Sequence, residues 1–300
     1  MDELDKKIVT DLQRNCRISY QELSRKYGIS ANAIRRRILN MEESGVISGY
    51  SIVMSPAMTG TSFLFGLLST DGSRDEDEMV NAIGSSKYIM AASSYTDGVY
   101  ALVAEYHGPH ELQELSAFLR TLDSVENAEL HTIIGTWGEK MNLTKTHLRV
   151  LAPLLEDPRL PIVDIAQKTG LTARRVRRLI GELEENNAIR FVSLVELGAA
   201  TSLPFIIRIL WNEKAVTQHT MAEWLEKNYP LKHRETYQSA SEPVIYALLV
   251  ADDITELVET IRSIRRNKHV TSVKALISGH HKYFSSYRRE KLIQMAKDSK

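Results

Sequence analysis

The chain has 300 residues, of which 43% are hydrophobic, so it is too long for one ordinary domain and apolar enough to build several packed cores. It contains no run of about 18 apolar residues, and its first residues are charged, so we expect neither a membrane span nor a secretory signal. The 38 basic and 38 acidic residues balance. A nucleic-acid partner can therefore be argued only from where the arginines lie.

A single cysteine, Cys16, excludes a disulfide framework and a cysteine-based zinc site within one chain. We therefore expect a protein of the reducing cytoplasm. The sequence has no phosphate-binding glycine loop, nucleophile elbow or HExxH motif, so we expect no enzyme activity and no cofactor. The pair His280-His281 has no acidic or cysteine partner at ligand spacing, so we expect a solvated tail there and no metal site.

An internal repeat organises the chain. Residues 20–50 align without a gap with residues 162–192, at a constant offset of 142. The identical pairs occupy turn, helix-face and core positions, and they include Gly28 with Gly170, Arg35 with Arg177, Arg36 with Arg178, Glu42 with Glu184 and Ile47 with Ile189. A repeat of this length indicates a duplicated module rather than a solenoid.

Each copy begins with three short helices and a strand. In the first copy Gly28 supplies the left-handed residue that ends the second helix, and Ser30 caps the third. In the second copy Gly170 and Thr172 take these parts. The pattern predicts winged helix-turn-helix modules at residues 1–55 and 146–197.

After each module the chain alternates between strand and helix. Residues 60–135 have the order βαββαβ, which is that of a ferredoxin-like domain, and residues 201–279 repeat it. Polar residues 136–145 are expected to link the halves, and residues 280–300 to form a basic C-terminal tail. The sequence thus predicts an α+β protein, a tandem repeat of a winged helix-turn-helix followed by a ferredoxin-like domain.

The third helix of each copy carries a run of arginines. Because successive helical residues are about 100° apart, such a run spreads positive charge over more than one face. Alone it is typical of a solvated face, but its occurrence twice in a helix-turn-helix favours contact with double-stranded DNA. The predicted DNA-binding residues are Ser30, Ala31, Asn32, Arg35, Arg36 and Arg37 in the first copy, and Thr172, Arg174, Arg175, Arg177 and Arg178 in the second.

The two copies differ at one predicted base-reading position. Asn32 is suited to adenine, whereas Arg174, its counterpart, favours guanine or phosphate. We therefore expect the modules to prefer different DNA sequences.

Several segments of the first copy resemble the Lrp/AsnC (feast/famine) family of regulators. They include Arg17-Ile18-Ser19, Gly28-Ile29-Ser30 and Glu42-Glu43-Ser44-Gly45. The resemblance is strongest over residues 2–60 and weakest over residues 203–278. It implies a DNA-binding N-terminal module and a ferredoxin-like (RAM) domain that dimerises through its sheet and can bind an amino acid between dimers as a small-molecule effector. Ordinary members carry one copy of each module, so this chain resembles a fused pair.

The resemblance also locates a candidate effector site. The family's third-strand motif is glycine, any residue, tyrosine, aspartate, but here the first copy reads Gly98-Val99-Tyr100-Ala101 and the second also has alanine, Ala247, in place of the aspartate. The missing carboxylate disfavours an amino acid as the ligand. The candidate effector-binding residues are Tyr95, Asp97, Gly98, Tyr100, Tyr237 and Tyr246.

We expect the ferredoxin-like domains to pair by sheet-to-sheet packing, either within one chain as a pseudo-dimer or between chains as a homodimer. This pairing would hold the two DNA-binding modules at the separation of successive major grooves, about 34 Å. The expected operator is an imperfect palindrome.

Two hypotheses from other classes remain. Siroheme decarboxylases share the Lrp/AsnC architecture and bind a tetrapyrrole with histidine, arginine and aromatic residues, and the segment 229–237 offers His233, Arg234 and Tyr237. The strand pattern associated with those enzymes does not follow this segment. A pure assembly protein that has lost DNA binding is the other alternative, and the arginines in both copies argue against it.

Overall fold

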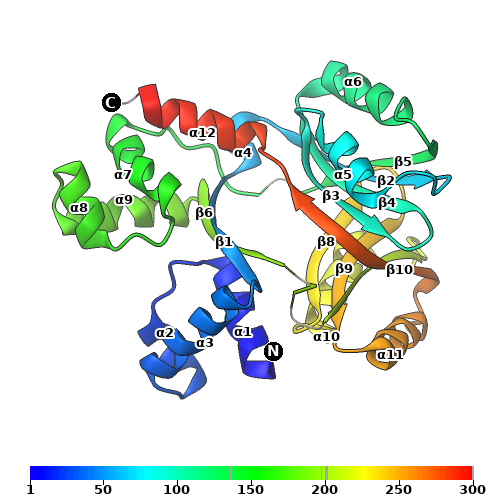
Figure 1. Ribbon diagram of the computed structural model, residues 1–300, viewed down its shortest axis with the longest axis horizontal. Helices are drawn as coiled ribbons and strands as arrows, with labels where there is room; N and C mark the ends of the chain where they lie inside the picture. The colour runs from blue at the N-terminus through cyan, green and yellow to red at the C-terminus, as the bar shows by residue number, and fades with distance from the viewer. Residues whose placement is uncertain (136, 197, 200–201, 299–300) are drawn as a thin grey trace. The chain divides into compact units, whose positions relative to one another are not determined.

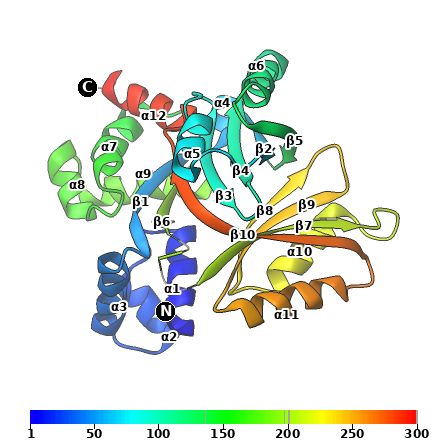
Figure 2. The same ribbon diagram turned by 45° about the vertical axis from the view of Figure 1, so that its right-hand side comes forward.

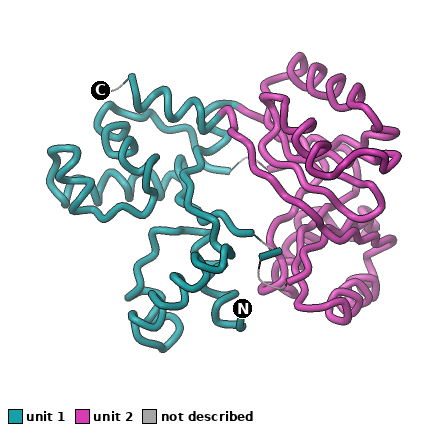
Figure 3. Tube along the Cα trace, viewed as in Figure 1, with its two compact units in different colours: residues 1–60, 136–200, 288–300 teal, residues 61–135, 201–287 magenta. Residues whose placement is uncertain are grey.

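The computed structural model describes residues 1–135, 137–196, 198–199 and 202–298 (Figure 1). The chain divides into two compact units: unit 1 comprises residues 1–60, 136–200 and 288–300, and unit 2 comprises residues 61–135 and 201–287 (Figure 3). Each unit collects equivalent parts of the repeat. Unit 1 holds both helix-turn-helix modules and unit 2 both ferredoxin-like domains, and the predicted tandem α+β fold is confirmed.

Module 1, the first helix-turn-helix, consists of α1 (Glu3–Arg14), α2 (Tyr20–Tyr27), α3 (Ala31–Glu43) and β1 (Ile47–Met54). Asp2 and Ser19 begin α1 and α2 with capping boxes, which satisfy backbone N–H groups that each helix leaves free. The apolar faces of the three helices meet in a core that contains Ile8, Leu23 and Ile34, all fully buried. The 3.6-residue spacing of these side chains is what directs the faces inward.

Module 2 consists of α7 (Lys145–Glu156), α8 (Ile162–Thr169), α9 (Ala173–Glu185) and β6 (Ile189–Val195). Its core also receives Leu292, fully buried, from α12 (Tyr287–Asp298). The expectation of a solvated tail at His280-His281 is therefore wrong, and the basic tail beyond it forms an ordered helix as far as residue 298. Strand β10 runs on to Tyr283, and α12 follows with Leu292 in the core of module 2 and Met295 packed against that core.

The two modules pair directly with each other within unit 1. Strands β1 and β6 form a two-stranded antiparallel sheet in which Ile47 lies opposite Val195 and Met54 opposite Ile189. Each strand therefore takes its partner from the other module rather than completing a wing alone. The segment expected as a linker also packs here, since Leu143 joins the core of module 2. The short helix α4 (Pro56–Thr59) follows β1.

The ferredoxin-like domains of unit 2 have the predicted element order. The first contains β2 (Ser62–Thr70), α5 (Glu76–Gly84), β3 (Ile89–Tyr95), β4 (Val99–Tyr106), α6 (Gly108–Arg120) and β5 (Val125–Ile134). The second contains β7 (Leu203–Trp211), α10 (Gln218–Asn228), β8 (His233–Ser239), β9 (Val244–Ala251), α11 (Ile254–Arg265) and β10 (Val270–Tyr283). The helices cover one face of each sheet, as the positions of α10 and α11 in Figure 2 show.

The two sheets join edge to edge into a closed barrel within one chain, in the order β10-β3-β4-β2-β5-β8-β9-β7. One join pairs Ile133 of β5 with Ser239 of β8, and the other pairs His281 of β10 with Ser93 of β3. The interior of the barrel holds its own apolar cluster, which includes Phe65. The two sheets therefore do not pack face to face, as expected, but form one continuous hydrogen-bonded barrel. Such closure leaves no exposed sheet edge.

Candidate nucleic-acid interface

Helix α3 presents one apolar and one polar face. Its N-cap Ser30 accepts a hydrogen bond from the Ala33 N–H at 3.1 Å, and Gly28 just before it has φ 70°, a conformation that glycine adopts without strain. Buried Ile34, Ile38 and Met41 fix the helix against module 1. This orientation leaves the side chains of Ser30, Asn32, Arg35 and Arg36 exposed and Ala31 half-buried.

Arg37 is not among the side chains that α3 leaves exposed. Its Nη1 atom lies 2.7 Å from an Asp2 carboxylate oxygen and 2.7 Å from one of Asp5. Hydrogen bonds to the Asp5 and Asp2 carboxylates raise the pKa of Arg37. This arginine therefore ties α3 to the start of α1, and the structure does not place it with the exposed arginines.

Helix α9 presents a stronger positive face. Thr172 caps it by accepting a hydrogen bond from the Arg175 N–H at 3.3 Å, and the side chains of Val176, Ile180 and Leu183 are buried. The side chains left outside are Thr172, Arg174, Arg175, Arg177 and Arg178, all exposed.

Most of this charge on α9 is uncompensated. Arg178 pairs with Glu182 one turn later, with Nε 3.3 Å from the carboxylate. In the part of the chain that the structure describes, no carboxylate lies within ion-pair distance of Arg174, Arg175 or Arg177. Exposed guanidinium groups at the start of a third helix suit phosphate oxygens and guanine edges.

The candidate effector residues separate into two groups. Tyr95, Tyr237 and Tyr246 face the barrel interior, where the Phe65 ring stacks on Tyr237 at 4.7 Å and meets Tyr246 at 4.6 Å between centroids. Tyr100 points to the opposite face of the sheet and belongs to the core beneath α5 and α6. Asp97 and Gly98 form the left-handed turn between β3 and β4. Effector binding by the whole set stays a prediction.

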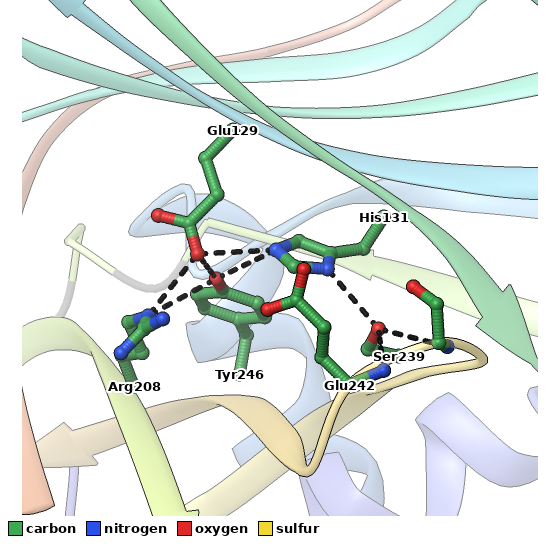
Figure 4. A network of polar contacts seen from close by, with 7 residues as sticks. Glu129, His131, Arg208, Ser239, Glu242 and Tyr246 are labelled. Carbon is green, nitrogen blue, oxygen red and sulfur yellow. Dashed lines mark hydrogen bonds and ion pairs between the residues drawn. The ribbon is translucent and has the colours of Figure 1, made fainter.

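A polar network that the sequence did not suggest lies on the interior face of the barrel (Figure 4). Tyr246 donates a hydrogen bond to Glu129, whose carboxylate is also 3.1 Å from His131 Nε2 and 3.2 Å from Arg208 Nε. His131 reaches Ser239 of the other domain at 3.1 Å. Burial alone would raise the pKa of Glu129, but hydrogen bonds from Tyr246 and His131 and the charge of Arg208 hold it below its usual value.

This network spans the two ferredoxin-like domains, because β5 belongs to the first and β7, β8 and β9 to the second. Its groups satisfy one another, as buried polar groups must. One signal was available in the sequence: Arg208 interrupts the otherwise apolar strand Leu203–Trp211. Its partners could not be identified, since Glu129 is 79 residues away.

His280 and His281 both contact residues of the first ferredoxin-like domain. His281 Nδ1 lies 2.6 Å from the Ser93 hydroxyl, and His280 Nδ1 lies 3.6 Å from an Asp77 oxygen. Across the described ranges, three or more histidine, cysteine or acidic side chains do not gather anywhere as metal ligands would. Nor does any helix there combine the length and apolar character needed to cross a bilayer.

The DNA-binding character of both modules is matched by protein-family comparison. A model of the AsnC-type helix-turn-helix domain matches residues 1–42, and a model of winged helix-turn-helix DNA-binding domains matches residues 143–190. Two modules of this kind, each with an exposed cationic third helix, define a double-stranded DNA-binding protein.

Similar proteins are found among archaeal regulators. The HTH-type transcriptional regulator FL11 of Pyrococcus furiosus is 30% identical over 136 residues, which are 45% of this chain and 88% of FL11. The uncharacterized HTH-type transcriptional regulator PH0045 of Pyrococcus horikoshii is 47% identical over 60 residues, 20% of this chain and 39% of PH0045, so the match spans less than half of that relative. The chain belongs to the Lrp/AsnC family of helix-turn-helix transcriptional regulators, as the sequence predicted.

Among the solved structures similar over nearly the full length of the chain, one carries a bound ligand analogue. It is the siroheme decarboxylase NirDL in complex with an iron-uroporphyrin III analogue, with a TM-score of 0.59 and 14% identity, covering 99% of this chain and 98% of NirDL. At this identity the likeness shows that the two proteins share the tandem fold.

Proposed function

We propose that the protein is a sequence-specific, double-stranded DNA-binding transcriptional regulator that acts as an intrachain pseudo-dimer in the cytoplasm. The carrying observation is that two exposed, arginine-bearing third helices, α3 and α9, occur in one compact unit. Both the β1–β6 sheet and the barrel of unit 2 pair equivalent parts of a single chain. These pairings supply within one chain the two-fold arrangement that a dimer uses on an operator.

The test is selection of duplexes from a random DNA library by the purified chain, followed by fluorescence anisotropy on the enriched duplex. We expect an enriched motif with two unlike half-sites, because Asn32 and Arg174 differ in base preference. The logarithm of affinity should fall linearly with the logarithm of salt concentration, by about 0.9 for each phosphate contacted. Failure to enrich any motif over input DNA would refute sequence-specific binding.

The full-length likeness to NirDL supports a second candidate, a tetrapyrrole enzyme. The candidate ligands do not converge, however. His233 and Tyr237 lie on opposite faces of the second sheet: His233 pairs with Leu249 of the helix-covered core, and Tyr237 faces the barrel interior. Burial also lowers the pKa of His233 to about 4, and its Nε2 atom is bonded to Thr236 at 2.6 Å. We therefore propose that the protein is not an enzyme.

Titration with an iron-uroporphyrin separates the two candidates. A regulator without a tetrapyrrole site leaves the Soret band of the free porphyrin unshifted, and DNA affinity is the same with and without the porphyrin. A saturable Soret shift that is lost in His233→Ala would favour the enzyme instead.

A further inference from the structure

Module 2 reaches the third helix of module 1 through one arginine. Arg159, in the loop between α7 and α8, donates from Nη1 to the Tyr50 hydroxyl at 2.7 Å, and Tyr50 donates to Glu42 at 2.5 Å. The Arg159 guanidinium also lies over the rings of Tyr50 and Tyr20, 4.9 and 5.2 Å from their centroids. Glu42 is in the last turn of α3. The loop of module 2 therefore contacts the C-terminal end of α3 through Tyr50 and Glu42.

Module 1 makes the reciprocal contact with module 2. Arg17, in the loop between α1 and α2, donates to the carbonyl oxygens of Pro158 at 2.6 Å and Leu160 at 3.0 Å. Its neighbour Asn15 donates from Nδ2 to Glu184 at 3.0 Å. Glu184 is in the last turn of α9.

The arginines and the acidic residues at these contacts occupy equivalent positions of the repeat. The offset of 142 residues relates Arg17 to Arg159 and Glu42 to Glu184. Each module thus extends an arginine-bearing loop toward the other module, and each third helix is held near its C-terminal end by the module to which it does not belong. The two braces therefore use equivalent arginines that have different hydrogen-bond partners.

The braces add to a connection that is made by the two-stranded β1–β6 sheet and by shared cores, since Cys16, Ile52 and Met54 lie in the core of module 2 and Val195 in that of module 1. A two-stranded antiparallel ribbon twists strongly and has little stability alone. The braces add stacked guanidinium groups with side-chain exposure as low as 19% at Arg159. A planar guanidinium that stacks and forms several hydrogen bonds loses less freedom for each bond formed than a lysine would.

We propose that Arg17 and Arg159 are positioning residues that fix the separation and relative orientation of α3 and α9, so that the protein accepts one half-site spacing. This inference rests on the proposed DNA-binding function. A rigid pair of helices cannot follow two half-sites that are moved apart along the duplex. Inserting five base pairs, about half a helical turn, turns the second site to the opposite side of the DNA.

The first experiment measures rigidity without DNA. Spin labels are attached at Glu43→Cys and Glu185→Cys, the exposed last residues of α3 and α9. Native Cys16 is buried and burial raises the pKa of its thiol to about 12, so it does not compete for the label. Double electron–electron resonance should give one narrow distance distribution for this labelled chain and a distribution at least twice as broad when Arg17→Ala and Arg159→Ala are added. Equal widths would overturn the proposal.

The second experiment measures spacing preference on the duplex enriched by the wild-type chain. A five-base-pair insertion between its half-sites should weaken wild-type binding at least a hundredfold, and weaken binding by R17A/R159A less than tenfold. The same penalty in both proteins would also overturn the proposal. If the wild type binds no DNA, the proposed function fails together with the operator part of this inference, whereas a broadened distance distribution would still support the brace itself.

Two further variants guard against simple loss of folding. Arg149→Ala removes an exposed arginine whose hydrogen bond to the Thr169 carbonyl stays within module 2, so it should leave the distance distribution and the spacing penalty unchanged. Arg159→Glu should broaden the distribution, and adding Glu42→Arg should narrow it again by restoring the opposite charges. If R17A/R159A fails to fold, this charge reversal decides the question. A distance distribution as broad in R159E/E42R as in R159E alone would then contradict a positioning role for Arg159.

Discussion

The two third helices descend from one repeat but present different charge. On α3, Arg37 is held by Asp2 and Asp5, so two arginines remain outward. On α9 all four arginines are exposed, and the position equivalent to Arg37 is occupied by Leu179, which is buried. The same backbone module therefore carries about half as many outward guanidinium groups in its first copy as in its second.

From this difference we expect the two helices to have different roles on DNA. Phosphate contacts supply most of the salt-dependent affinity, whereas side chains that reach base edges supply specificity. Helix α9 has the charge for the first role. Helix α3, with exposed Asn32 between two small residues, is better suited to reading an adenine.

The largest expected effect comes from α9. Replacing Arg174 and Arg175 with alanine should weaken binding to the enriched duplex about a hundredfold, since each lost contact costs about 1–3 kcal/mol. The slope of affinity against salt should also become shallower. Circular dichroism should show that the fold is unchanged, because both side chains are exposed.

The matched control for that variant is Arg262→Ala with Arg266→Ala, a pair of exposed arginines at the end of α11 in unit 2. This pair should leave DNA affinity within twofold of the wild type. An equal loss from both double variants would mean that net charge, and not α9, sets the affinity.

The next prediction concerns the stability of the module cores rather than DNA binding. Leu292→Ala should lower the free energy of unfolding of unit 1 by about 3 kcal/mol, because it leaves a cavity where α12 fills the core of module 2. The described core residues of module 1 include Val195 of β6 but none from α12. Urea unfolding measures the loss, and a change below about 1 kcal/mol would show that α12 is only loosely attached.

A smaller effect is expected from α3. Arg35→Ala with Arg36→Ala should weaken binding about tenfold, less than the α9 pair, because this helix contributes fewer outward charges. Asn32→Ala should instead relax base preference at one position in a selection experiment, with little change in salt dependence. The proposed difference between the helices is wrong if the α3 pair costs as much as the α9 pair.

The smallest effect should come from Arg37. Since its guanidinium is engaged by Asp2 and Asp5, Arg37→Ala should change DNA affinity less than threefold and cost at most about 1 kcal/mol of stability, as for other partly exposed ion pairs. Anisotropy and urea unfolding test both values. A tenfold loss of DNA affinity would instead show that Arg37 contributes to DNA binding.

The sequence was informative wherever a feature is local. Gly28 and Ser30, with their equivalents Gly170 and Thr172, fixed the turn and the cap of each third helix, and the buried face then determined which arginines point outward. The exposed face of each third helix was predictable to that extent. The repeat itself predicted the order of the domains.

Contacts between distant parts of the chain were not predictable. Nothing near Arg37 shows that Asp2 and Asp5 will lie beside it, and the arginine run alone places all of its members equally. The register of β1 against β6 and the joins that close the barrel depend on which edges meet in three dimensions. Similarly, α12 looks basic in sequence, and only the buried Leu292 shows that it belongs to a core.

Hydroxyl-radical footprinting of the enriched duplex shows whether α3 and α9 of one chain bind the same DNA, on which the proposed function depends. We expect two protected patches for the wild type, of which R174A/R175A loses one and R35A/R36A loses the other. A single patch, or two patches that both survive the α9 substitutions, would contradict binding of one duplex by both helices.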